Sequence, residues 1–158
     1  MPTQLQTRMG YLTAAGIVTA ANVTLTAAGL PLFKASRGVL PTRGLLLDEA
    51  HRAVPGLAVD VSDVRTLDRF SGGVNHQQIQ AVYWLLVGNS TRAQALSAAR
   101  IYCDAVRAAV DDVCRGSFML FRHVRTDPEG VADSIGQTPV RLCSVSFEAD
   151  WTAEDSEE

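Results

Sequence analysis

Residues 77–87 alternate between two kinds of side chain and therefore predict a β-strand. One face is apolar along its whole length and carries Ile79, Ala81, Tyr83, Leu85 and Val87. The other face begins polar and then turns apolar, in the order Gln78, Gln80, Val82, Trp84 and Leu86. A strand that is apolar on both faces at one end must be covered there on both sides. We expect either a second layer of this domain or another subunit to provide the second cover.

Residues 91–115 predict a long amphipathic helix, because apolar side chains recur there at spacings of three and four. The apolar stripe consists of Leu96, Ala99, Cys103, Val106, Val110 and Val113. The opposite, solvated face carries Arg92, Arg100, Asp104, Arg107 and Asp111. Thr91 and Gln94 form a capping-box pattern at the start. Gly116 is placed to terminate the helix.

Four further strands are expected, at residues 57–61, 64–70, 117–125 and 140–151. In the second of them, Leu67 is expected between Arg65 and Arg69 on one face. The Gly-rich residues 71–75 predict a hairpin turn into the central strand, and residues 127–130, with the sequence DPEG, predict a loop. The strand at 117–125 places Phe118, Leu120 and Val124 against Met119 and Phe121. In the last strand Cys143, Val145, Phe147, Ala149 and Trp151 face inward, and Ser144, Ser146, Glu148 and Asp150 face outward.

The N-terminal segment has no charged residue between Met9 and Phe33. Threonine and alanine dilute its apolar character, so a soluble helix is favoured over a membrane span, and a signal peptide is the alternative. One side of this helix would carry Leu5, Met9, Leu12, Gly16, Ala20 and Val23. That thin stripe suits close packing on a partner better than a thick core. Residues 30–42 follow as a linker or extended arm, and residues 42–53 as a short helix with Leu45, Leu46, Ala50 and Ala53 on one face.

These elements together predict an α+β fold. A mainly antiparallel sheet of four to five strands would be packed by one long amphipathic helix and preceded by an N-terminal helical segment. The expected organisation is an N-terminal helix and arm at 1–41, a core domain at 42–151, and an acidic disordered tail at 152–158. A chain of 158 residues and 17.0 kDa suits one domain and is too short for two ordinary ones.

Net charge and cysteine content reduce the number of function classes that the sequence supports. The net charge of -3 argues against a protein whose main task is to bind nucleic acid. Cys103, Cys114 and Cys143 are odd in number and lack a CxxC pair, which indicates buried free thiols. The three histidines, His51, His76 and His123, have no metal-ligand spacing. We therefore expect neither a metal nor a cofactor.

Catalytic patterns are missing as well, and the sequence predicts a protein that is not an enzyme. It contains no GxSxG, GxxxxGK[ST], HExxH or GxGxxG motif. Asp60 and Asp63 are typical of a turn at a strand end, and Asp111 and Asp112 are adjacent on a helix, where neighbours do not share a face. His76 is interpreted as a surface group of the hairpin.

Three segments carry a resemblance to a known family: AVPGLAV at 53–59, AVYWLLVG at 81–88 and RLCSVSF at 141–147. With the order of elements, they resemble the tail-terminator (tail-completion) proteins of long-tailed bacteriophages over residues 42–151. The resemblance implies a non-enzymatic virion protein, assembled in the host cytoplasm, that forms a homo-oligomeric ring, a hexamer in that family. The ring would close the tail tube and join it to the head or neck. Its partners would be the tail tube protein and a head-completion or connector protein, and DNA would pass through the lumen without specific binding.

Six residues are interface candidates under this interpretation: Trp84, Leu86, Arg65, Arg69, Arg92 and Arg100. Asp104 and Asp111 are possible partners of the arginines, and the lumen is expected to be acidic or near neutral. Two other classes of function stay open. One is a small α+β module that binds an apolar ligand between sheet and helix, lined by Tyr83, Trp84 and Phe147. The other is an enzyme with an unrecognised site. The sequence leaves open the subunit number, the identity of the neighbouring proteins and whether the tail contracts.

Overall fold

Five strands and three helices form the protein in the computed structural model, which describes residues 4–34, 39–48, 54–62, 65–70, 73–88, 92–114, 120–135 and 138–154. The helices are α1 (Gln4–Ala28), α2 (Arg43–Leu47) and α3 (Arg92–Cys114). The strands are β1 (Gly56–Val61), β2 (Arg65–Phe70), β3 (Val74–Gly88), β4 (Leu120–Ile135) and β5 (Thr138–Glu154). The predicted α+β class is confirmed.

The five strands make one antiparallel sheet centred on β3. Along one side of β3 lie β2, near its start, and β1, near its end; along the other side lies β5, followed by β4. The pairing of β3 with β5 runs from Val74 opposite Glu154 to Gly88 opposite Val140. Strands β2 and β3 pair up to Phe70 opposite Val74, and Gly73, just before β3, has a φ of 78°. Ser71 and Gly72 of the predicted turn lie outside the described residues.

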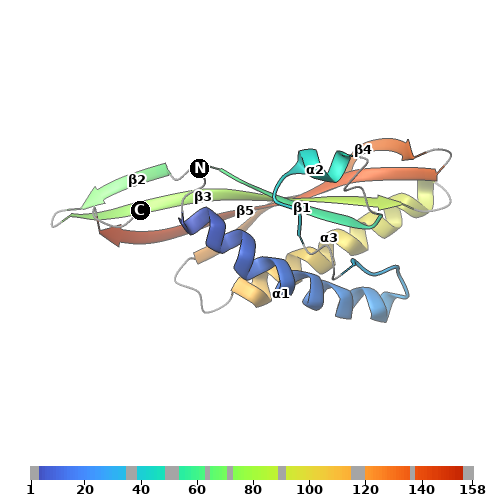
Figure 1. Ribbon diagram of the computed structural model, residues 1–158, viewed down its shortest axis with the longest axis horizontal. Helices are drawn as coiled ribbons and strands as arrows, with labels where there is room; N and C mark the ends of the chain where they lie inside the picture. The colour runs from blue at the N-terminus through green and yellow to red at the C-terminus, as the bar shows by residue number, and fades with distance from the viewer. Residues whose placement is uncertain are drawn as a thin grey trace.

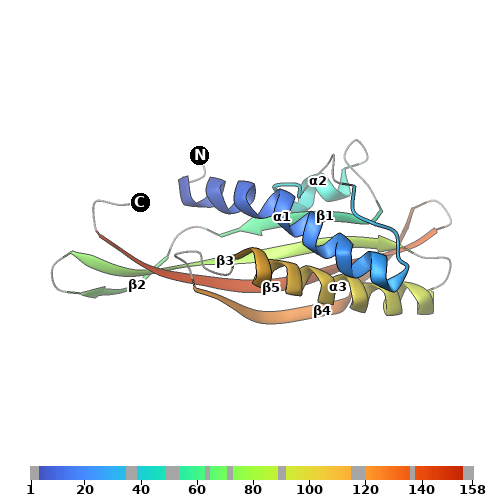
Figure 2. The ribbon, with the colours of Figure 1, turned by 90° about the horizontal axis from the view of Figure 1, so that it is seen from below.

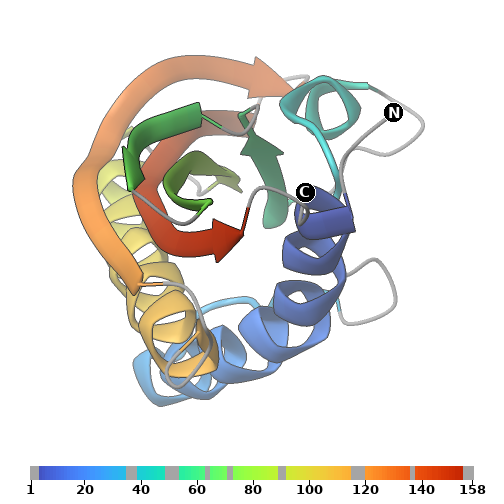
Figure 3. The same cartoon turned by 90° about the vertical axis from the view of Figure 1, so that its left-hand side faces the viewer.

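Both long helices cover the same face of the sheet, here called the helix face (Figures 1 and 3). The short helix α2 lies on the opposite, outer face (Figure 1). The prediction of a single long helix is not confirmed, because the protein has two: α1 with 25 residues and α3 with 23. The helix predicted at residues 91–115 corresponds to α3. Buried residues of α1, such as Ile17 and Leu25, belong to the same core as those of α3 and the sheet.

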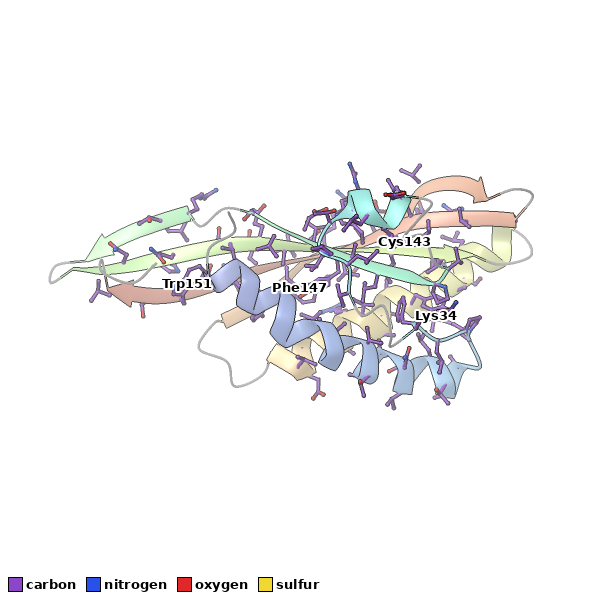
Figure 4. The ribbon with its side chains drawn as sticks, in the orientation of Figure 1. Lys34, Cys143, Phe147 and Trp151 are labelled. Atoms are coloured by element: carbon purple, nitrogen blue, oxygen red, sulfur yellow. The ribbon has the colours of Figure 1, made fainter. Side chains whose placement is uncertain are left out.

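The predicted inward faces of the central strand, the last strand and the long helix are confirmed. All five apolar side chains predicted for the helix face of β3 are buried, and so are the five of β5. Figure 4 shows Cys143, Phe147 and Trp151, which follow one another along β5 on this face. In α3, Ala99, Cys103, Val106 and Val110 are buried, whereas Leu96 and Val113 are partly buried at its two ends.

The buried face of α1 differs from the predicted one. Ile17, Val18, Ala21 and Leu25 are buried, whereas Val23 is 69% exposed. The side chains of α1 itself are small on every side of the helix. Hydrophobic spacing alone therefore did not identify the face that packs. Gly16, which was on the predicted stripe, does lie at the contact with α3: a Cβ there would come within 3.1 Å of both γ-carbons of Val113. The side chains of Leu5, Met9 and Leu12 lie outside the described part of α1.

The segment after α1 is fixed to the helices rather than extended freely. The Asn22 side chain accepts a hydrogen bond from the Phe33 N–H and donates one to the Phe33 carbonyl oxygen, both at 2.9 Å. Phe33 is buried and packs edge-to-face on Tyr102 of α3, with ring centroids 5.6 Å apart. The Tyr102 hydroxyl donates to the Pro31 carbonyl oxygen at 2.5 Å. The first part of the predicted arm therefore contributes to the core.

The prediction of a loop at residues 127–130 is wrong, because strand β4 continues through these residues. The pairing of β4 with β5 shifts register between Asp127 and Val131, so the extra residues form a bulge. Gly130 has a φ of 41°, and a Cβ there would lie 1.8 Å from the Leu142 carbonyl oxygen. Only glycine fits this close approach of two strands. The sequence Pro-Glu-Gly thus marks a bulge inside a strand.

A second register shift in β4, between His123 and Arg125, leaves Val124 exposed instead of on the predicted apolar face. Phe121, predicted on the face opposite Val124, is paired with Ala149 and is partly buried against the core. Phe118 and Met119 fall outside the described residues, and the side chain of Leu120 is among those that the structure leaves out.

Two predicted boundaries also change. Thr152 to Glu154 were expected in a disordered tail but form the end of β5, paired with β3; residues 155–158 lie outside the described part. The predicted helix at 42–53 is shorter, since α2 ends at Leu47 and residues 49–53 are not described. Thr42 caps α2 by accepting a hydrogen bond from the Leu45 N–H at 3.4 Å.

Candidate functional site

The apolar end of the outer face is covered by the chain itself. A small apolar cluster, separate from the main core, contains buried Leu46 of α2 together with Ala58, Leu86 and Val140. Leu40, Trp84 and Leu142 pack around it. The chain itself therefore supplies a second cover for this end of the central strand, with α2 and the segment before it. Leu86, an interface candidate, is buried beneath this cover within one chain.

Trp84, the second apolar candidate, lies at the edge of the same cluster and is only partly buried. The Arg43 guanidinium lies 4.9 Å from the centroid of its ring, in a cation–π contact. The indole Nε1 of Trp84 is buried and has no hydrogen-bond partner among the described residues. Trp84 therefore contacts the apolar cluster and the Arg43 guanidinium. Among the described residues, no acceptor bonds to its indole N–H.

Two anchors hold α2 over the cluster. Leu40 forms an isolated bridge with Ala58: its N–H donates to the Leu57 carbonyl, and its carbonyl accepts from the Val59 N–H, each at 2.9 Å. The Arg43 N–H donates to Asp60 Oδ2 at 3.2 Å. Asp60, considered above as a candidate acidic residue, therefore holds the start of a helix, and Asp63 lies outside the described residues.

The polar end of the outer face carries a hydrogen-bonded network of four side chains: Gln78, Arg122, Glu148 and Asp150. Arg122 pairs with Asp150 at 2.7 Å and with Glu148 at 3.3 Å. The Gln78 amide donates to Asp150 at 2.9 Å, and His76 Nε2 lies 3.9 Å from the same carboxylate. The alternation of residues 140–151 predicts Glu148 and Asp150 on the outward face of their strand, but no sequence pattern brings Arg122 to them. The pairing of β4 with β5, which sets Arg122 opposite Glu148, decides this contact.

Arg65 and Arg69 do not share a face of β2, contrary to the prediction. Arg65 is paired with Gln78 and Arg69 with Asn75, and the register shifts between them, after Thr66. Gln78 and Asn75 are three residues apart on β3, so they face opposite sides of the sheet. Because directly paired residues share a face, Arg65 lies on the outer face beside the polar network, and Arg69 occupies a position on the helix face.

The other two arginine candidates lie on α3. Arg100 is exposed on its solvated face, as are Asp104, Arg107 and Asp111. Arg92 is the first residue of α3, and its side chain is outside the described set. The six candidates are thus distributed over three places: the covered apolar cluster, the strand β2 and the helix α3.

The lining predicted for an apolar ligand is divided between the two faces of the sheet. Tyr83 and Phe147 lie on the helix face, fully buried, with their rings edge-to-face at 5.9 Å. His123 packs on the other side of Phe147, with centroids 5.6 Å apart. Trp84 belongs to the cluster on the outer face. These three aromatic residues therefore do not line one cavity.

Three buried or half-buried groups titrate away from their ordinary range. Burial, followed by the charge of Arg107, lowers the pKa of His123, while Asp111 and a hydrogen bond that the imidazole donates to the Arg125 backbone act in the opposite direction. Its Nε2 lies 2.6 Å from Thr126 Oγ1. Burial raises the pKa of Tyr102 to about 12. A hydrogen bond to the Cys143 side chain, and then burial, raise the pKa of the Cys103 thiol.

Two cysteine predictions are confirmed, since Cys103 and Cys143 are buried free thiols. With raised pKa, the Cys103 thiol stays protonated and is a poor nucleophile. Within the described ranges, no group of three or more His, Cys, Asp or Glu residues could hold a metal ion. No helix in the described part of the chain combines the length and the apolar character needed to cross a membrane.

Comparison with known proteins adds no relative to this description. The chain matches no known family, and no curated protein is significantly similar to it. The resemblance to tail-terminator proteins accordingly stays a prediction from the sequence.

Proposed function

We propose that the protein is a non-enzymatic structural component of a virion, which forms a ring that closes the tail tube and joins it to the head or neck. The observation that carries the proposal is the extension of the sheet beyond its helices. Strand β2 and the adjacent ends of β3 and β5 project past α1 and α3 (Figures 1 and 2). Two or three strands without a covering layer are only marginally stable in water. A neighbouring subunit that covers these projecting strands would therefore stabilise them and the assembly.

Such a projection supports head-to-tail assembly. A contact between the projecting strands of one copy and the body of the next is heterologous, because the two surfaces differ. Repeated contacts of this kind close into a ring when the rotation between copies permits it. Arg65 is exposed on β2 near the acidic network of the outer face. Its guanidinium is suited to pair with a carboxylate of the neighbouring copy.

Within this proposal the ring is a hexamer that contacts the tail tube protein on one side and a head-completion or connector protein on the other. Its lumen is acidic or near neutral, because lysine or arginine side chains lining it would bind the DNA phosphates and slow the passage of DNA. The net charge of -3 is consistent with passage of DNA without specific binding.

Native mass and negative-stain images test the ring. Six copies of 17.0 kDa would have a mass of about 102 kDa. We expect particles of that mass whose proportion falls as salt screens the ion pairs between subunits. Arg65→Glu should reduce the ring population, whereas Arg125→Glu, on the strand at the other edge of the sheet, serves as the matched control. A chain that stays monomeric at every concentration would contradict the proposal.

DNA binding is the second readout. Titration with duplex DNA at low salt should show weak binding at most. Tight binding that weakens steeply with salt would indicate a nucleic-acid partner in place of a passive channel.

A further inference from the structure

The exposed face of α3 carries four charged residues in one narrow stripe: Arg100, Asp104, Arg107 and Asp111. At 3.6 residues per turn, these positions fall within about 60° of one another around the helix axis. All four side chains are exposed. The stripe is about 16 Å long, at 1.5 Å per residue, and it carries two positive and two negative charges.

Within the described part of the chain, these four charges are not joined in ion pairs. Arg100 and Asp104, like Arg107 and Asp111, have the four-residue spacing of helical ion pairs, but the ion pairs of the described residues join none of the four. In both cases the basic residue precedes the acidic one, which is the weaker order for pairing within a helix. Asp111 also lies in the last turn of α3, where the helix dipole disfavours a carboxylate. Asp104 and Arg107, three residues apart with the acidic residue first, have the favoured order, but the ion pairs of the described residues do not join them either. In the part of the chain that the structure describes, no ion pair within the helix therefore occupies these charges.

The order of the charges is self-complementary. Along α3 the stripe reads positive, negative, positive, negative. When a second copy of the same helix is placed antiparallel, each position faces its mirror position across the midpoint between residues 105 and 106. Arg100 then faces Asp111 of the other copy, and Asp104 faces Arg107. Every charge meets its opposite, four times in the complete contact.

We infer that the stripe Arg100–Asp104–Arg107–Asp111 of α3 is a contact surface for a second copy of this chain, which docks antiparallel about a two-fold axis. The contact is isologous, since the same surface serves both copies. The ring contact proposed above is heterologous and is argued from the projecting strands and Arg65, so this inference does not depend on it. It assigns Arg100, an interface candidate from the sequence, to a two-fold contact instead.

Charge reversal and its rescue test the contact by sedimentation of the full-length chain. Arg100→Glu should place a second carboxylate against Asp111 of the other copy and weaken dimerisation about tenfold or more. Asp111→Arg should do the same by opposing two guanidinium groups. The double variant Arg100→Glu/Asp111→Arg should restore dimerisation to nearly the original strength. Residues 100 and 111 lie about 16 Å apart along one helix, so rescue between them can occur only across two copies.

Further controls separate this contact from folding and from ring formation. Asp112→Arg reverses a neighbouring exposed charge about 100° away around the helix, and it should leave dimerisation unchanged. Circular dichroism and thermal unfolding should be alike for all variants, because every substituted side chain is exposed. Arg65→Glu, which tests the ring, should not affect the two-fold contact.

The reversed stripe gives the sharpest version of the experiment. A chain with all four charges exchanged should dimerise with itself but not with the original chain, because mixing places like charges opposite each other. An original chain that shows no association through this face, single variants that associate as well as it does, or a double variant as weak as the single variants would each overturn the inference.

Discussion

The two ends of the outer sheet face are shielded from water by different means, although one strand, β3, runs through both. At the apolar end, Leu86 is buried beneath α2 and Trp84 is partly covered by Arg43. At the polar end, no described helix covers the face, and Gln78 and Asp150 are held in the network with Arg122. A sheet face can thus be completed by a short covering helix or by side chains that satisfy one another. The first solution depends on apolar burial, and the second on hydrogen bonding and ion pairing between a half-exposed arginine and largely buried polar side chains.

The largest effect is expected where burial is complete. Leu86→Ala should destabilise the fold by about 2–5 kcal/mol, because it removes apolar atoms and leaves a cavity under α2. Chemical denaturation would measure this loss. The matched change at the polar end is Gln80→Ala, on an exposed side chain of the same face, for which we expect a loss of less than about 0.5 kcal/mol. Equal losses in the two variants would show that α2 does not seal the apolar end.

A smaller effect is expected from the anchor of that cover. Thr42→Ala removes the side chain that caps α2 and should cost about 1 kcal/mol. Since α2 has only five residues, its release should also expose Trp84 and shift its fluorescence to longer wavelength. Thr42→Ser keeps the hydroxyl and should retain both stability and emission. A red shift in the serine variant as well would assign the effect to the lost methyl group.

At the polar end, Arg122→Ala should cost at most about 1 kcal/mol, because its guanidinium is half-exposed and well screened. A double-mutant cycle of Arg122→Ala with Asp150→Asn would isolate the pair, and its coupling energy should fall when salt is raised. A salt-independent coupling of several kcal/mol would place this network among buried ion pairs and remove the contrast between the two ends.

The smallest effect concerns pH and the helix face beneath the polar end, where His123 packs on Phe147. Its pKa in the folded chain lies below the ordinary 6.5. The unfolded chain therefore binds a proton first as pH falls, and stability should decrease from about pH 6.5 downward until the folded histidine is also protonated. His123→Gln should make the melting temperature less dependent on pH between about 7.5 and 5.5. An unchanged slope would show that another group controls it.

The sequence by itself determined the elements in which side-chain periodicity is strong. Alternation in β3 and β5 and the three-to-four spacing in α3 identified the buried faces correctly, because long apolar side chains on one side must leave water. It also showed that one end of β3 needs two covers. The same patterns predict Gln78 on the partly polar face of its strand, and Glu148 and Asp150 on the outward face of theirs. The pairing of β3 with β5, which brings the three together, comes from the structure.

Only the tertiary structure decided which segments meet. Periodicity does not say that α2 covers Leu86, that β4 brings Arg122 to Asp150, or that α1 uses Ile17 and Leu25 rather than Val23. In α1 the residues are small on all sides, so close approach to α3 selects the face. In β4 the sequence Pro-Glu-Gly has the local preference of a loop, and hydrogen bonding to β5 overrides it by absorbing the extra residues in a bulge. Local sequence determines which side of an element avoids water, whereas contacts between elements distant in sequence determine what covers that side.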